Sequence, residues 1–281
     1  MAFQSGSPNH LSDILLAVSA LHLRFLNPND QSVQLASSYY LDLGLQKLNS
    51  MLSEVNEENS PLVFVSSALV ALHVLVSRLE LKRGNQYFVP SAWFRMLQGI
   101  KNIASLSRPW IMKSKLEPLL LDDQLLLRGW PMDDDTPFTE LLVGLEDESL
   151  DPECIAVYVD AVRYLRWAYA LHQAREEKHI VRRNVLAFPT TLPARYISLL
   201  ERHDPRTLVI TAHFFGLVTC VDEIWWLQGV ANEIWGILTL VPDSWVWAMK
   251  WPVQQIQHDP HAISISKVCK VVPEHCMSGV C

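Results

Sequence analysis

The chain has 281 residues, of which 49% are hydrophobic and 19% charged, and its formal net charge is -7. This length and apolar content suffice for one sizeable core, so one domain is expected. No basic stripe is long enough to follow a phosphate backbone, and direct binding of nucleic acid by this chain is therefore not expected.

The chain shows no feature of a secreted or membrane-spanning protein. Its longest apolar runs, residues 62–76 and 208–221, are shorter than the roughly 18 to 20 residues that span a bilayer. The N-terminus lacks the basic region and apolar core of a secretory signal. The cysteines number five, an odd count that indicates free thiols in a reducing compartment. We expect an intracellular protein, of the cytoplasm or the nucleus, with no transmembrane segment.

Apolar residues at intervals of three and four predict four helices in the first third of the chain, over residues 11–26, 31–55, 61–79 and 91–106. Asn27-Pro28 ends the first helix, and Pro61 opens the third at a position that proline favours. The third helix is apolar on most sides, which predicts a central place in the fold.

The middle of the chain is less regular. Its prolines and acidic runs predict surface loops with short helices over residues 115–127 and 138–143. A long helix is expected from 152 to about 185. Pro189 and Pro193 mark a break before a short helix over 194–202.

Residues 207–251 contain six of the ten tryptophans. The first part, 208–221, is apolar almost all round, which predicts a helix buried on every side. After Asp222-Glu223, apolar residues again recur every three or four positions and predict a second helix. The two helices would form a hairpin with more aromatic surface than it can bury alone.

These elements predict an all-α fold, an irregular multi-helix array around a central apolar helix and a tryptophan-rich C-terminal helical hairpin. Residues 1–9 are a polar lead-in, and 10–256 form the helical domain. Residues 257–281 show no helical stripe and are expected to be a disordered tail.

The aromatic hairpin has two interpretations. Its side chains either pack as ordinary core or line a pocket for an apolar ligand, because such pockets are mostly apolar and aromatic with a few polar groups. The candidate ligand-binding residues are His213, Phe214, Leu217, Trp225, Trp226, Val230, Ile234, Trp247, Met249 and Trp251.

A second candidate site is the acidic run Asp133, Asp134 and Asp135, with Glu140 beyond it. Clustered carboxylates can hold Mg²⁺ against a diphosphate, and aromatic walls can shield carbocations, which is the chemistry of a class I terpene cyclase. The run lies between two prolines, however, and no second metal motif of the N-x3-S-x3-E type occurs. A solvated acidic loop is the alternative interpretation.

No other metal or cofactor site is expected. Histidine and cysteine side chains of the tail could bind zinc, but their spacings fit no known zinc-binding pattern, and a disordered tail is the favoured interpretation. These residues are His258, His261, Cys269, His275 and Cys276. His22, His73 and His213 lie in apolar helices, where hydrogen-bonded core histidines are expected.

Six segments carry a resemblance to a known family. In order along the chain they are HLSDILLAVSALHLRF, YYLDLGLQKL, the predicted helix over residues 62–79, WFRMLQGIKNI, WWLQGVANEIWGIL and PDSWVWAMKWP. Together they resemble the fungal-specific transcription factor domain, and most closely the branch that contains the sterol uptake control regulators. The resemblance covers residues 10–256. It implies a helical domain that binds ergosterol, in proteins whose N-terminal six-cysteine zinc cluster binds DNA.

The chain departs from that family at the zinc cluster. The cluster needs two C-x2-C-x6-C repeats, and this sequence contains no C-x2-C. The chain is thus either an excised regulatory domain or a standalone member that does not bind DNA by itself.

Three functions remain open from the sequence. The resemblance implies a ligand-sensing regulatory domain of a fungal transcription regulator, with a sterol or similar apolar metabolite as ligand and a second copy or a partner regulator as protein partner. The alternative is a standalone, Mg²⁺-dependent isoprenoid or polyene cyclase. The third is a scaffold that dimerises with full-length regulators and binds no small molecule.

Overall fold

The computed structural model describes residues 10–81, 87–117, 120, 136–145 and 150–256. Within these ranges the chain forms α-helices and short 3-10 helices and no strand, so the all-α prediction is confirmed. The lead-in 1–9, the tail 257–281 and most of the predicted helix 115–127 lie outside the described residues.

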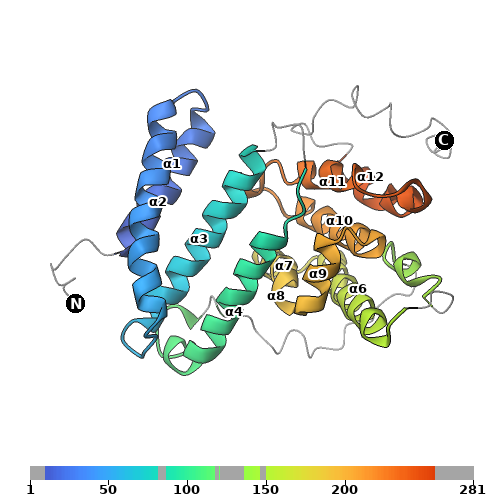
Figure 1. The fold of residues 1–281 in the computed structure, drawn as a ribbon, viewed down its shortest axis with the longest axis horizontal. Helices are drawn as coiled ribbons and strands as arrows, with labels where there is room; N and C mark the ends of the chain where they lie inside the picture. The colour runs from blue at the N-terminus through green and yellow to red at the C-terminus, as the bar shows by residue number, and fades with distance from the viewer. Residues whose placement is uncertain (1–9, 82–86, 118–119, 121–135, 146–149, 257–281) are drawn as a thin grey trace.

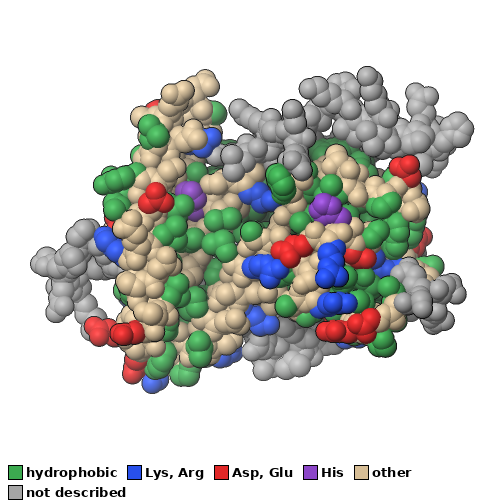
Figure 2. All heavy atoms as spheres, viewed as in Figure 1, with side chains coloured by type: hydrophobic (Ala, Val, Ile, Leu, Met, Phe, Trp, Pro, Cys, Tyr) green, Lys and Arg blue, Asp and Glu red, His purple; other side chains and the backbone are tan. Residues whose placement is uncertain are grey.

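Helices α1 (His10–Leu26) and α2 (Gln31–Leu52) form an antiparallel hairpin at one edge of the molecule (Figure 1). Asp30 caps α2, since its carboxylate accepts the backbone N–H of Ser32 at 3.0 Å. Hydrophobic side chains are scattered over the outer surface of this hairpin at the left edge of Figure 2, and Leu35 and Tyr39 are among the most exposed.

Helix α3 (Ser60–Leu81) lies between that hairpin and α4 (Ser91–Ile111) (Figure 1). Its residues 60–79 are long and apolar enough to cross a bilayer. From the sequence, only the uninterrupted apolar run 62–76 was counted, so the length of this apolar helix was underestimated. The helix packs on α1, α2 and α4, and more than half of this stretch is buried inside the protein. These contacts are those of a core helix of a globular fold.

The single long helix predicted over 152–185 is wrong. Two helices occupy this region, α6 (Pro152–Gln173) and α7 (Lys178–Leu186). Arg175 adopts a left-handed backbone conformation with φ of 55°, and the N–H of Glu176 bonds the carbonyl of Leu171 at 3.4 Å. A left-handed residue of this kind commonly ends a helix, and it is usually glycine. Here the residue is arginine, so the sequence contained no sign that α6 ends.

Helices α8 (Phe188–Thr191) and α9 (Ala194–Glu201) lead to α10 (Pro205–Thr219). Every residue from Arg206 to Val218 is buried, which confirms the helix predicted to be enclosed on all sides. Asp204 caps α10 by accepting the backbone N–H and the hydroxyl of Thr207 at 2.8 and 2.7 Å.

The prediction of one second helix in the hairpin is also wrong, because the chain there forms several short helices. The chain after α10 forms η3 (Trp225–Leu227), α11 (Ala231–Leu238), η4 (Asp243–Met249) and α12 (Lys250–Ile256). Gly229, with φ of 86°, separates η3 from α11 in a conformation that favours glycine. The predicted short helix over 138–143 is the 3-10 helix η2 (Thr139–Leu142).

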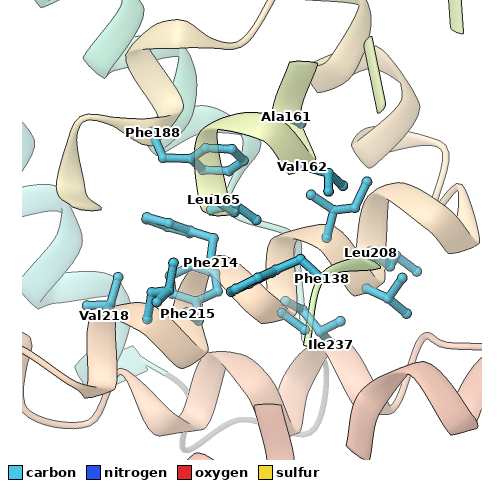
Figure 3. Packing of buried hydrophobic residues seen from close by; sticks show 14 of the residues in the cluster. Phe138, Ala161, Val162, Leu165, Phe188, Leu208, Phe214, Phe215, Val218 and Ile237 are labelled. Carbon is cyan, nitrogen blue, oxygen red and sulfur yellow. The ribbon is translucent and has the colours of Figure 1, made fainter. Parts of the chain in front are cut away.

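The largest hydrophobic core surrounds α10 (Figure 3). Phe188 and Phe214 stack with ring centroids 5.0 Å apart, and Phe215 lies 4.9 Å from Phe214. Two smaller clusters lie elsewhere, one between α1, α2 and α3 and one around Phe64 and Ile111. The array is therefore centred on α10, while α3 joins this core to the smaller clusters.

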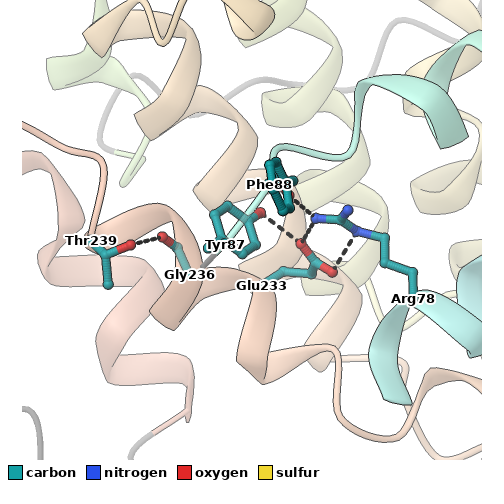
Figure 4. A network of polar contacts seen from close by, with 6 residues as sticks. All are labelled: Arg78, Tyr87, Phe88, Glu233, Gly236 and Thr239. Atoms are coloured by element: carbon teal, nitrogen blue, oxygen red, sulfur yellow. Dashed lines mark hydrogen bonds and ion pairs between the residues drawn. The ribbon is translucent and has the colours of Figure 1, made fainter. Parts of the chain in front are cut away.

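A buried ion pair fastens α3 to α11 (Figure 4). Arg78 donates from Nε to Oε1 of Glu233 at 3.0 Å and from Nη2 to Oε2 at 2.9 Å. The Tyr87 hydroxyl donates to Oε2 at 2.7 Å, and Arg78 also donates to the carbonyl of Phe88. The Tyr87 ring lies on Gly236, where an added Cβ would come within 2.0 Å of it. Burial raises the pKa of Tyr87 well above its usual value, so the phenol remains protonated and donates.

We expect Glu233→Ala to lower the free energy of unfolding by about 3 to 5 kcal/mol, because it leaves a mostly buried guanidinium without its carboxylate. The matched control is Glu201→Ala. Arg95 and Glu201 form the same two-bond geometry, at 3.2 and 2.7 Å, but both side chains are exposed. That control should cost less than about 1 kcal/mol. Urea denaturation measures both, and equal losses would contradict the importance of the buried pair.

Candidate ligand-binding site

A pocket of about 780 Å³ lies between α3, α4, α7 and α8, and we call it the groove. Ligand pockets in proteins typically have volumes of about 300 to 1,000 Å³. Its floor is one face of α3, since the lining residues of that helix recur at intervals of three and four. These are Phe64, Ala68, Ala71, Leu72 and Leu75.

The side walls come from α4 and from the α7–α8 segment. The α4 wall is formed by Trp93, Leu97, Ile100, Lys101, Ala104, Ser105 and Arg108. The opposite wall is formed by Arg183, Leu186, Ala187, Thr190 and Thr191, again at helical spacing, while Leu120 and Trp226 complete the lining. Alanines occur on all three sides, and their short side chains leave the space that larger residues would fill.

Two hydrogen bonds join the walls. Nζ of Lys101 donates to the carbonyl of Thr190 at 2.9 Å, and Nε2 of Gln98 donates to the carbonyl of Leu192 at 2.7 Å. Both bonds run from an α4 side chain to backbone in or just after α8. The hydroxyls of Thr190 and Thr191 bond carbonyls one turn earlier, at 2.7 and 2.8 Å, so they support the wall itself.

Of the residues proposed from sequence as ligand-binding, only Trp226 lines the groove. Six others are fully buried in the main core around α10: His213, Phe214, Leu217, Val230, Ile234 and Met249. The groove residues of α3 and α4 belong to faces that the helical periodicity had marked as core. Their signal in the sequence was the recurrence of alanine at positions 68, 71 and 104 within those faces.

Trp225 connects η3 to the α1–α2 hairpin. Its ring stacks on His22 with centroids 4.5 Å apart, and Phe25 lies 5.9 Å away. His22 is exposed, so the expectation that it is a buried core histidine is wrong. His73 does fit that expectation, because it is buried and its Nε2 lies 2.8 Å from the hydroxyl of Ser37.

A second pocket, of about 330 Å³, brings together His213, Trp247 and Trp251 with Glu140 of η2. The rings of His213 and Trp251 are nearly parallel, at 13°, with centroids 5.4 Å apart. Nδ1 of His213 lies 2.7 Å from the carbonyl of Val209. Burial lowers the pKa of His213 to about 4, so the imidazole is neutral at physiological pH.

The proposed acidic site cannot be placed as a cluster. Asp133, Asp134 and Asp135 lie outside the described residues, and so do the histidines and cysteines of the tail. Glu140 is exposed and belongs to the lining of the second pocket, as does Lys250. Among the residues with described positions, no three His, Cys, Asp or Glu side chains come together as a metal site would require.

The burial of His213 makes stability depend on pH. The unfolded chain binds a proton at this residue below about pH 6.5, whereas the folded chain does so only near pH 4. Folding is therefore favoured fully above pH 6.5, and about 3 kcal/mol of stability is lost as the pH falls to 4. We expect His213→Gln to flatten this dependence in urea denaturation series, whereas His179→Gln, at an exposed position, should not. If the free energy of unfolding of His213→Gln still fell with pH as steeply as that of wild type, His213 would not be the source of the dependence.

Comparison with known proteins finds two relatives, and both are Zn(2)-C6 fungal-type transcription factors. A Zn(2)-C6 fungal-type transcription factor of Gibberella zeae is 32% identical over 275 residues, which cover 90% of this chain and 54% of the relative. The Zn(2)-C6 fungal-type transcription factor afumD of Aspergillus fumigatus is 23% identical over 206 residues, 72% of this chain and 54% of the relative. No protein-family model matches the chain.

The chain thus spans about half the length of the curated relatives it matches. Their names do not favour the cyclase alternative, and nothing in them refers to a sterol. The two matches make this chain a homologue, over about half of their length, of Zn(2)-C6 fungal-type transcription factors, and they support a relation to that family.

Proposed function

We propose that this chain is a ligand-sensing regulatory domain of a fungal transcription regulator, and that the groove takes a sterol or another largely apolar metabolite. The observation that carries the proposal is the groove itself, an apolar space of about 780 Å³ bounded by three helical walls. The homology to Zn(2)-C6 transcription factors supports the regulatory role, which would be exercised in the nucleus.

The groove is a better candidate than the aromatic hairpin. The hairpin side chains that were expected to touch a ligand mostly fill the main core. A sterol-sized ligand could bind there only by displacing them. The groove needs no such displacement, because its volume is present between the helices. Trp226, at its edge, offers an aromatic surface to a flat apolar molecule.

The groove also suggests how occupancy is transmitted. One wall belongs to α4, and the other to α7 and α8, which pack on α10 or α6 in the main core. The hydrogen bonds of Lys101 and Gln98 link α4 to the α8 region. A ligand would add apolar contacts between the same walls and favour the arrangement in which they are close. A second copy or a partner regulator would then read that arrangement.

We expect Ala104→Trp to remove ligand binding, because the indole would occupy the groove from the α4 wall. Native mass spectrometry of the purified chain, followed by extraction, should find an apolar molecule bound to wild type and at least about tenfold less bound to the variant. Ala156→Trp, at an exposed position of α6, is the matched control and should retain the molecule.

Circular dichroism and urea denaturation establish that Ala104→Trp is folded, and Ala68→Phe repeats the test from the α3 floor. Equal retention by folded wild type and both groove variants would place the ligand elsewhere.

A further inference from the structure

The outward face of α1 carries no charge. Exposed residues along it recur at intervals of four, three, four and three, which is the spacing of a coiled-coil seam. They are Ser12, Leu16, Ser19, Leu23 and Leu26, with Leu15 beside them. The two charged residues of α1 lie off this stripe, since Asp13 is buried and bonds Lys47 at 2.7 Å, and Arg24 is half-buried. The pattern therefore predicts a contact with another helix.

The serine at the middle of the stripe does not require water. The hydroxyl of Ser19 donates to the carbonyl of Leu15 at 2.7 Å, so its proton is already bonded within the helix. The side chain is also small and leaves room for a second helix to come close. This part of the stripe can therefore be buried without leaving a hydroxyl proton unbonded.

The apolar surface continues onto α2. Leu35 and Tyr39 are exposed in the first turns of α2, which follow the end of α1 after a short loop (Figure 1). The six large apolar side chains of the two helices are between 46% and 73% exposed. In the described part of the chain, none of them belongs to a hydrophobic cluster. Single exposed leucines are ordinary, but a group of this size on one hairpin is typical of an interaction surface.

The size of this patch matches one side of a dimer interface. Six large side chains at these exposures present on the order of 500 Å² of apolar surface. A stable protein–protein interface buries about 800 Å² on each partner, of which roughly 60% is apolar. The patch therefore supplies the apolar area that one partner needs.

We propose that this face binds the same face of a second copy of the chain across a twofold axis, with the two α1 helices antiparallel and centred on Ser19. Leu15 and Leu23 are each four residues from Ser19, so the axis places Leu15 of one copy beside Leu23 of the other. A twofold interface needs a surface that matches itself, and an uncharged leucine stripe does so because no like charges meet. The two α1–α2 hairpins then form a four-helix bundle.

Sedimentation equilibrium of the full 281-residue chain tests this association without any ligand. Wild type should have twice the 32.0 kDa mass of one chain. The double variant Leu16→Glu/Leu23→Glu should raise the Kd of the dimer at least about 100-fold, because the interface would then bury two unpaired carboxylates from each copy. Both leucines are exposed, so the variant chain should fold, which circular dichroism and urea denaturation establish.

Two control variants separate the hairpin from the rest of the chain. Leu106→Glu places the same charge on an exposed leucine of α4 and should remain dimeric. Ala104→Trp, which fills the groove, should also remain dimeric. The proposed dimer is therefore independent of the proposed ligand, and either can fail without the other.

A cysteine at the centre of the stripe tests the position of the axis. On mild oxidation, Ser19→Cys should form a disulfide-linked dimer in excess of wild type, which has five cysteines of its own. Asn102→Cys, exposed on α4, is the control and should form no more linked dimer than wild type.

Three results would count against the proposal. Wild type that stays monomeric at about 100 µM would overturn it and leave this face to a different protein. A dimer that survives Leu16→Glu/Leu23→Glu would overturn it by placing the interface elsewhere in the chain. A dimer that these charges dissociate, but that forms no additional cross-link in Ser19→Cys, would overturn the axis through Ser19.

Discussion

The complete burial of α10 is the constraint on which the arrangement of the other helices depends. A helix that is apolar on all sides cannot rest on a surface, so it must be enclosed. Helices α6, α7, α9, α11 and α12 and the 3-10 helices η2 and η4 all pack against it. Its polar groups are accommodated inside this enclosure. Arg206 donates to the carbonyls of Leu141 and Val143, and Thr211 lies 2.9 Å from the Tyr196 hydroxyl.

The groove lies beside this enclosure, in the seam between α3–α4 and α7–α8. Along this seam the facing residues include several alanines, and a space of about 780 Å³ remains between the helices. The Arg78–Glu233 pair holds α3 to α11, and Lys101 and Gln98 hold α4 to the α8 region. A space kept open between anchored helices is what a pocket for a small molecule requires. In the proposed function, a ligand in the groove would change how α3 and α4 sit relative to α7 and α8.

The element order was largely predictable, because burial of one helix face leaves a period of three to four residues in the sequence. The errors arose where the backbone turned without its usual residue signal. Arg175 ends α6 in a left-handed conformation that glycine would normally supply. At Gly229 the glycine was present, but the apolar stripe continued across it, so η3 and α11 were read as one helix. Of the residues that line the groove, only Trp226 was predicted from the sequence. Helical periodicity indicates that a residue faces inward, but it does not distinguish a residue packed in the core from one that lines a cavity.

The sequence by itself determined that the chain is helical, that residues 208–221 lie at its centre, and that it resembles a fungal regulatory domain. These properties depend on local periodicity, composition and segment order, which one chain displays directly. Only the tertiary structure decided where space remains. A cavity depends on how far side chains from α3, α4, α7 and α8 reach toward one another, and those helices are distant in the sequence.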